Sequence, residues 1–246
     1  MTAVDGVLFD IDDTLVDTRA AFGMALREVA TTYLPGVQDT RHADVLAMWR
    51  ADAGGHYARY TRGEAGYQEQ RMARANELQA AFGGTALDEP GYQEWNEVFE
   101  RGFADAWAAH PEATEVVDLL IAAGLAVGAL SNAGVAYQTS KLVRTGLGGR
   151  VPMLVGVDTL GVGKPDPSSF LEACRRLGTS PDRTAYVGDE LDVDALGAVR
   201  AGLIGVWVDR PGRRRVPIST EQVIAAQSAG VHVVRSLSEV PGLLGV

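Results

Sequence analysis

Short apolar runs alternate with helix-like patterns along most of this chain. The first run, at residues 4–9, is mostly apolar and predicts a buried strand. After residue 110, similar runs predict strands at residues 125–130, 153–157, 184–187, 203–208 and 231–234. Helical patterns separate these strands, and strands joined in this way lie parallel in a doubly wound sheet with helices on both faces. The predicted fold class is therefore α/β.

The segment between the first two predicted strands has a different pattern. Helical spacing continues from Thr18 to about Trp107, with no convincing strand. Its last stretch carries aromatic residues at helical spacing, which we interpret as the core of a small helical bundle: Tyr92, Trp95, Phe99, Phe103 and Trp107. The pattern thus predicts an all-helical domain at residues 17–107, inserted into a core formed by residues 1–16 and 108–246.

Local sequence signals predict where several helices of the core domain begin and end. Asp166 and Pro167 are typical of an N-cap and a first helical turn, and Gly178 is typical of a C-terminal stop. Cys174 lies on the apolar side of this predicted helix, so we interpret it as a core residue. Pro111 is predicted to occupy the first position of another helix.

Composition limits the partners of the chain. Its 246 residues are 46% hydrophobic and 22% charged, as in ordinary globular proteins, and the formal net charge is -10. This acidic balance disfavours nonspecific binding to nucleic acid or anionic membranes. A single cysteine excludes an internal disulfide, and neither a signal peptide nor a membrane-length apolar run is visible. We expect a cytoplasmic protein, either a monomer or a homodimer, with no nucleic-acid or membrane partner.

Polar clusters directly follow three of the predicted strands: "DIDDT", "SNAG" and "GDELDVD". Ligands of doubly wound sheets bind at the carboxyl ends of the strands, where such clusters meet if their strands are neighbours. Residues two apart in an extended segment point the same way, so Asp10 and Asp12 are both expected to face this edge. Asp189 and Asp194 bring two more carboxylates to it.

So much negative charge in one place requires a cation. An oxygen-only ligand set suits Mg²⁺ better than zinc, and Mg²⁺ commonly shares its coordination with a substrate phosphate. Lys164, in the loop "GVGKPDP", supplies a positive charge, while Ser131 and Thr14 supply neutral donors. This combination is suited to holding a phosphoryl group while a carboxylate attacks it.

Four segments resemble, in order, the four motifs of the haloacid dehalogenase-like (HAD) hydrolase superfamily: "FDIDDTL", "LSNAG", "GKPDP" and "VGDELDVDALGAVRAG". The resemblance spans almost the whole core. It implies a Rossmann-like sheet and, in many members, a helical cap inserted just after the first motif. The predicted insert fits that arrangement, and as a cap it is expected to close over the site and select the leaving group.

The resemblance implies the catalytic roles. Asp10 would be the nucleophile that forms an aspartyl-phosphate, and it would also bind Mg²⁺. Asp12 would be the general acid/base, which protonates the leaving alkoxide and then activates water, and its backbone carbonyl would bind the metal. Lys164 would balance the charge of Asp10 and the phosphoryl group.

The resemblance also implies the residues around them. Thr14 would steady the first motif loop beside the phosphate. Ser131 and the backbone of Asn132 would bind phosphate oxygens together with Lys164. Asp189 would be a metal ligand, and Asp194 would be a ligand or a partner of one.

The motif matches leave three features of the sequence to be interpreted. Many relatives have glycine where Asp13 stands, although D-D-T also occurs in phosphatase branches. In the insert, "GGHYARYTRG" is either a solvated surface or a segment that contacts substrate. The basic run at residues 213–215 is interpreted as a solvated loop.

The leading hypothesis is a Mg²⁺-dependent phosphatase that acts on a small phosphorylated metabolite. A phosphomutase of the β-phosphoglucomutase type shares every core motif and stays an alternative. A 2-haloacid dehalogenase is disfavoured because that branch lacks an acid/base at the position of Asp12. A receiver-type signalling domain is disfavoured because its phosphorylated Asp ends a later strand and it has no helical insert. The substrate stays open among phosphoglycolate, sugar phosphates, acylneuraminate 9-phosphate and nucleoside monophosphates.

Overall fold

The computed structural model describes residues 4–210 and 217–246. It divides into two compact units, one of Met1–Asp17 with Ala108–Val246 and the other of Thr18–Trp107. Asp17, which we expected in the insert, falls in the first unit. The basic run at residues 213–215 lies outside the described residues.

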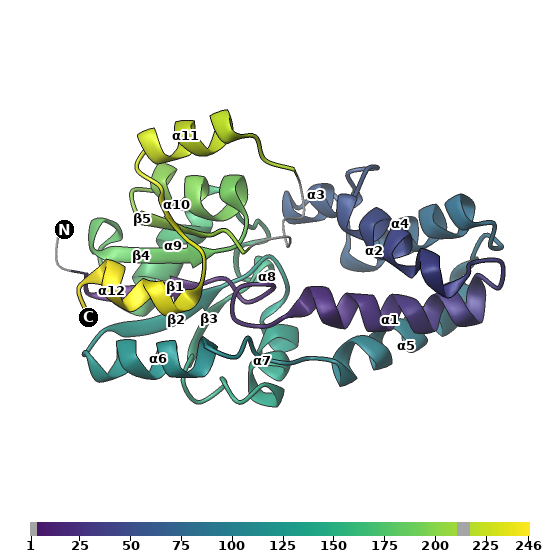
Figure 1. Ribbon diagram of the computed structural model, residues 1–246, viewed down its shortest axis with the longest axis horizontal. Coiled ribbons are helices and arrows are strands. Elements are labelled where there is room, and N and C mark those ends of the chain that lie inside the picture. The colour runs from purple at the N-terminus through teal and green to yellow at the C-terminus, as the bar shows by residue number, and fades with distance from the viewer. Residues whose placement is uncertain (1–3, 211–216) are drawn as a thin grey trace. The chain divides into compact units, whose positions relative to one another are not determined.

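The first unit contains a six-stranded sheet in which all neighbouring strands are parallel, with the order β3-β2-β1-β4-β5-β6 (Figure 1). The strands are β1 (Gly6–Phe9), β2 (Ala126–Leu130), β3 (Met153–Val155), β4 (Thr184–Gly188), β5 (Ile204–Val208) and β6 (His232–Val234). The predicted parallel sheet is therefore confirmed. Phe9 pairs in register with Ala129 on one side and with Val187 on the other. The carboxyl ends of β1, β2 and β4 consequently lie side by side.

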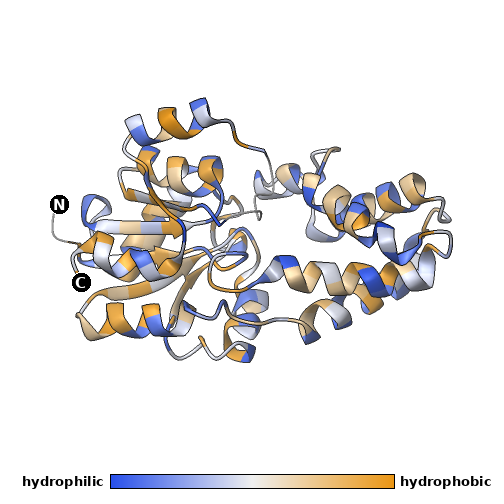
Figure 2. Ribbon diagram, viewed as in Figure 1, coloured by the Kyte–Doolittle hydropathy of each residue, from blue (hydrophilic) through white to orange (hydrophobic). Residues whose placement is uncertain are grey.

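Helices cover both faces of this sheet, as expected for a Rossmann-like α/β fold. They are α6 (Ala113–Ala122), α7 (Val135–Arg144), α8 (Val157–Leu160), α9 (Pro167–Leu177), α10 (Leu196–Arg200), α11 (Thr220–Ser228) and α12 (Val240–Leu244). Alternate residues of β1 enter different cores: Val7 and Phe9 pack in one cluster with α6, and Leu8 packs in another with α9. Figure 2 shows mainly hydrophobic strands and helices of mixed colour, as two-sided burial requires.

Helix ends follow their local signals in most places. Asp166 caps α9 by accepting from the backbone N–H of Ser168, and Gly178 ends that helix at a φ of 79°. The buried thiol of Cys174 confirms it as core. Pro111 was wrongly predicted as a first helical residue, because α6 begins at Ala113. The helix after β4 begins with a π-helical turn, Leu191–Ala195, which its sequence does not reveal.

All regular elements of the second unit are helices. Its elements are α1 (Thr18–Tyr33), a 3-10 turn (Asp39–Arg41), α2 (His42–Ala51), α3 (His56–Thr61), α4 (Tyr67–Phe82) and α5 (Glu89–Asp105). Four residues of the predicted aromatic stripe are buried on α5, and the rings of Trp95 and Phe99 stack with centroids 5.4 Å apart. The fifth, Trp107, lies beyond the end of α5 and is only partly buried. No helix among the described residues is long and apolar enough to span a membrane.

Candidate active site

The sheet edge formed by β1, β2 and β4 brings the polar clusters together. Asp10 directly follows β1, Ser131 follows β2 and Asp189 follows β4. The backbone N–H of Asp10 donates to the carbonyl of Val187 at 2.9 Å, so the first motif loop leaves its strand attached to β4. Residues more than 170 positions apart in the chain thus line one edge.

Lys164 lies at the centre of this edge and is 3% exposed. Its Nζ donates to Asp10 Oδ1 at 2.7 Å, to Asp194 Oδ1 at 2.6 Å and to the hydroxyl of Tyr186 at 2.7 Å. The Tyr186 hydroxyl in turn donates to the carbonyl of Leu130 at 3.0 Å. All three donors of the ammonium group are therefore directed at fixed acceptors. Tyr186 was not predicted as a site residue because its position inside β4 indicates only a strand.

Burial and mutual repulsion govern the charges here. Burial raises the pKa of Asp10 to about 8, with smaller contributions from the carboxylates of Asp194 and Asp12, while Lys164 opposes the rise. Burial, together with Asp13, also raises the pKa of Asp189 well above its usual range. For Lys164, burial alone favours the neutral amine, but Asp10 and Asp194 outweigh it and raise its pKa well above the usual value. One lysine does not neutralise this group of carboxylates.

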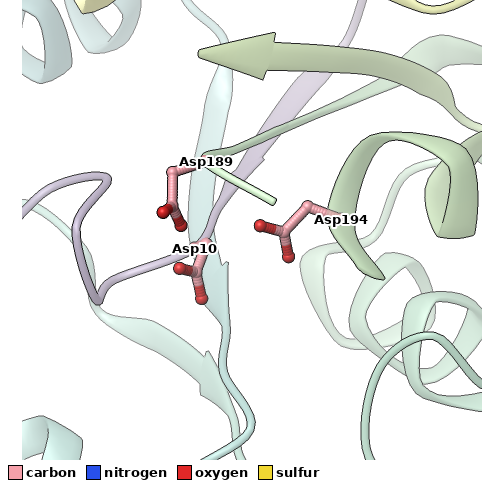
Figure 3. A group of neighbouring side chains, drawn as sticks. All are labelled: Asp10, Asp189 and Asp194. Carbon is pink, nitrogen blue, oxygen red and sulfur yellow. The ribbon is translucent and has the colours of Figure 1, made fainter. Parts of the chain in front are cut away.

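Three carboxylates meet closely enough to share a cation. Asp10, Asp189 and Asp194 each offer an oxygen, and these atoms lie within 4.8 Å of one another (Figure 3). Both oxygens of Asp194 are already engaged, one by Lys164 and the other by the backbone N–H of Glu190 at 2.9 Å. A hard divalent cation fits this oxygen-only set, and its charge would offset the cost that raises the carboxylate pKa values.

Asp12 lies apart from that group of three. Gln138 Nε2 donates to its Oδ2 at 2.6 Å, and Lys141 Nζ forms an ion pair with its Oδ1. Sequence reasoning missed both partners, because helical periodicity indicates only that the segment after "SNAG" is a helix. A signal was nevertheless present, since the chain contains only two lysines, Lys141 and Lys164. Both prove to be buried at this edge.

The predicted phosphate-binding residues are all buried at the same edge. Ser131 Oγ accepts from Gln138 Nε2 at 2.8 Å. The side chain of Asn132 donates to the Lys164 carbonyl at 2.9 Å and accepts from the Lys164 N–H at 2.6 Å. Asn132 therefore fixes the backbone that carries the lysine, a role the sequence did not suggest. Thr14 is fully buried, and within the described residues its hydroxyl has no hydrogen-bond partner.

Two glycines allow this close packing. A Cβ atom on Gly163 would lie 2.3 Å from Oδ1 of Asn132, and one on Gly188 would lie 2.4 Å from Cγ of Asp194. Real atoms do not approach so closely, so any side chain at either position would displace a residue of the site. The glycines of "GKPDP" and "VGDE" are thus needed for steric reasons.

The departure at Asp13 has a backbone explanation. Asp13 adopts a φ of 61°, in the left-handed region that glycine adopts freely and aspartate tolerates better than most residues. Its carbonyl is joined to His110 Nε2 at 3.2 Å, and its N–H donates to the Val16 carbonyl at 2.8 Å. A glycine or an aspartate therefore suits this turn, which accounts for both variants of the motif.

His110 is expected to make stability depend on pH. Burial lowers its pKa below 6.5, and Arg210 lowers it further, although Asp17 and Glu112 oppose the shift. The imidazole of His110 binds a proton more readily in the unfolded chain than in the folded protein. Stability therefore decreases as the pH falls below the pKa that His110 has in the unfolded chain. Relative to His110→Gln, the wild-type free energy of unfolding should fall by up to about 1.4 kcal/mol per pH unit. Urea unfolding between about pH 7.5 and 5.5 measures this difference, and parallel pH profiles would contradict it.

The segment "GGHYARYTRG" forms α3 and the residues beside it in the helical unit. His56 Nε2 lies 3.0 Å from Glu77 Oε1, and Arg62 is bonded to Glu64 at 2.7 Å. The side chain of Asp52 accepts from the backbone N–H groups of Tyr57 and Ala58, which orders the start of α3. These contacts explain the local fold of the segment. Its contact with substrate stays a prediction.

Comparison with known proteins agrees with the fold and the motifs. A family model described as haloacid dehalogenase-like hydrolase matches residues 4–202. The chain is 30% identical over 211 residues to the N-acetylmuramic acid 6-phosphate phosphatase of Pseudomonas aeruginosa, covering 80% of this chain and 82% of that protein.

A second relative matches over a shorter segment. The glyceraldehyde 3-phosphate phosphatase of Methanopyrus kandleri is 38% identical over 101 residues, which cover 41% of this chain and 43% of that protein. The match therefore spans less than half the length of that relative. Among solved structures, the magnesium-bound HAD hydrolase YfnB of Bacillus subtilis superposes with a TM-score of 0.78, at 20% identity and full coverage of both chains. That likeness concerns the fold.

Proposed function

Because the chain belongs to the haloacid dehalogenase-like hydrolase family, we propose that it is a Mg²⁺-dependent phosphatase that hydrolyses a small phosphomonoester through an aspartyl-phosphate intermediate. The observation that carries this proposal is the convergence of Asp10 and Lys164 at 2.7 Å from motifs 154 positions apart. Two curated relatives that are named as phosphatases support the same reaction class.

Asp10 is the nucleophile in this proposal. Lys164 donates to Oδ1, so Oδ2 is the oxygen presented for attack on phosphorus. As the new bond between Oδ2 and phosphorus forms, the bond between phosphorus and the ester oxygen breaks, and the leaving alkoxide takes a proton from Asp12. Asp12 then removes a proton from water, whose oxygen attacks the phosphorus and releases phosphate from Asp10.

Asp10 and Asp189 hold the metal by their side chains in this proposal, and Asp12 contributes its backbone carbonyl. Because Lys164 and the Glu190 N–H occupy the two oxygens of Asp194, this residue orients the cluster and ranks behind Asp189 as a direct ligand. When bound, Mg²⁺ neutralises the carboxylates and withdraws charge from the phosphoryl oxygens. Ser131, Asn132 and Thr14 complete the phosphate-binding edge.

Asp12 bears on the choice between phosphatase and dehalogenase. A halide leaves without a proton, whereas an alkoxide needs one, so an acid/base at this position is of use mainly in phosphoryl transfer. Its carboxylate has two hydrogen-bond donors, which supports the phosphatase. A mutase of the β-phosphoglucomutase type would use the same residues and differ in its product. Conversion of β-glucose 1-phosphate to glucose 6-phosphate, instead of to glucose and phosphate, would identify it.

Metal dependence is the direct test of this function. The purified protein with Mg²⁺ should release phosphate from p-nitrophenyl phosphate, EDTA should abolish the release, and excess Mg²⁺ should restore it, because the carboxylate cluster needs a cation. A panel of phosphorylated metabolites, including glyceraldehyde 3-phosphate and N-acetylmuramic acid 6-phosphate, then ranks the substrates by kcat/KM. Activity that persists unchanged in EDTA would contradict metal dependence. Absence of phosphate release from every ester would overturn the function.

A further inference from the structure

Two side chains on one face of α7 hold the carboxylate of Asp12 from both sides. Gln138 and Lys141 are separated by three positions, so they lie on neighbouring turns of the helix. They are 0% and 1% exposed, whereas the side chain of Asp12 is 37% exposed. We propose that Gln138 and Lys141 are positioning residues that hold Asp12 in the orientation for proton transfer to the leaving group. This proposal rests on the proposed phosphatase function.

The amide of Gln138 also joins Asp12 to the phosphate-binding edge. Its Nε2 donates to Asp12 Oδ2 at 2.6 Å and to Ser131 Oγ at 2.8 Å. Only the NH₂ end of an amide donates, so the carboxylate determines which way Gln138 points. One buried group on a helix therefore sets the separation between the acid/base and a predicted phosphate ligand.

Lys141 fixes the second oxygen of the same carboxylate. Its ion pair with Oδ1 prevents the carboxylate from rotating about the bond that Gln138 makes to Oδ2. Two donors from one rigid element define the plane of the carboxylate, whereas a partly exposed aspartate would otherwise sample several orientations. A general acid must lie within hydrogen-bond reach of the leaving oxygen, so a defined plane matters for the rate.

Fold stability does not account for this arrangement. Oε1 of Gln138 is buried and has no hydrogen-bond partner within the described residues. A buried acceptor left unsatisfied costs about 1–3 kcal/mol, and an apolar side chain of similar length would avoid that cost. Burying an ammonium group is also costly. A buried glutamine at position 138 and a buried lysine at position 141 are both explained if these side chains act on Asp12.

The leaving group reports directly on the proposed role. p-Nitrophenyl phosphate loses a stable phenolate that needs no proton, whereas glycerol phosphate loses an alkoxide that does. In Gln138→Met and Lys141→Met, kcat/KM should fall about 100-fold for glycerol phosphate and less than about fivefold for the aryl ester, within the range that general acids supply. Asp12→Asn should show the same split. Thr139→Ala, on the exposed side of α7, is the control and should change neither value.

Several outcomes would overturn the proposal. Equal losses for both esters in the two methionine variants would indicate a general structural role. In the Asp12→Asn background, Lys141→Met should cause no further loss of kcat/KM for glycerol phosphate if it acts through Asp12, and a multiplicative loss would contradict that path. Gln138→Met should unfold at the same temperature as the wild type or higher, so its loss of activity is separable from misfolding. Failure of the proposed function is distinguishable, because the wild type itself would then hydrolyse neither ester.

Discussion

Replacing Asp10 by asparagine is expected to abolish phosphate release while leaving the protein folded. Asparagine cannot form the aspartyl-phosphate, so kcat for p-nitrophenyl phosphate should fall by about four orders of magnitude or more, as when other covalent nucleophiles are removed. The fold should tolerate the change, because Lys164 keeps its ion pair with Asp194 at 2.6 Å. Phosphate assays and circular dichroism on the same sample measure both effects.

Thermal unfolding tests whether the Asp10→Asn variant stays folded. Burial raises the pKa of Asp10 to about 8, which means that the fold disfavours its ionised form. A neutral asparagine of the same shape removes that penalty, so in EDTA the Asp10→Asn variant should melt at the wild-type temperature or above it. Asp182→Asn, an exposed aspartate in the same unit, is the matched control and should retain activity. Wild-type activity in Asp10→Asn would exclude Asp10 as the nucleophile.

The second large effect is expected at Lys164. Lys164→Met leaves the buried carboxylates of Asp10 and Asp194 without their shared cation, and breaking a buried ion pair in this way costs about 3–5 kcal/mol. Activity should be lost as well, because the ammonium group that would balance the charge of the phosphoryl group beside Asp10 is then missing. Urea unfolding measures the loss of stability. Arg176→Met, which removes an exposed cation paired with Glu172, should change the stability little, because exposed ion pairs contribute little.

The pH dependence of this loss has a definite sign. Lys164 opposes the rise in the pKa of Asp10, so its removal raises that pKa further above its unfolded value. A carboxylate whose pKa is raised by folding favours the fold while it is protonated, and this contribution is lost as the pH rises through the folded pKa. The deficit of Lys164→Met should therefore grow as the pH rises above about 8, where Asp10 ionises in the wild type but stays protonated in the variant. In addition, Mg²⁺ should stabilise the variant more than the wild type. A deficit independent of pH would show that the electrostatic explanation is wrong.

Much of this protein follows from local sequence patterns. The apolar run before Asp10 predicts β1, and the Asp166-Pro167 pair predicts the start of α9, since an N-cap acts on the backbone beside it. The alternation of strands and helices predicts the parallel sheet, and the carboxyl-end rule then places the three motif loops that follow strands at one edge. The buried aromatic stripe of α5 likewise follows from helical spacing alone. These features depend on residues close together in the chain.

The partners of the site residues were decided only by the tertiary structure. Nothing in the sequence shows that the side chain of Asn132 holds the backbone of Lys164, that Gln138 and Lys141 face Asp12, or that Tyr186 reaches the ammonium group. Periodicity identifies the buried face of an element, but not which residue of another element meets it. That depends on strand order, on the rotation of each helix about its axis and on the packing of side chains from distant segments. The sequence by itself therefore determined the family and the fold and predicted the candidate site residues, whereas the contacts that orient those residues arose from packing.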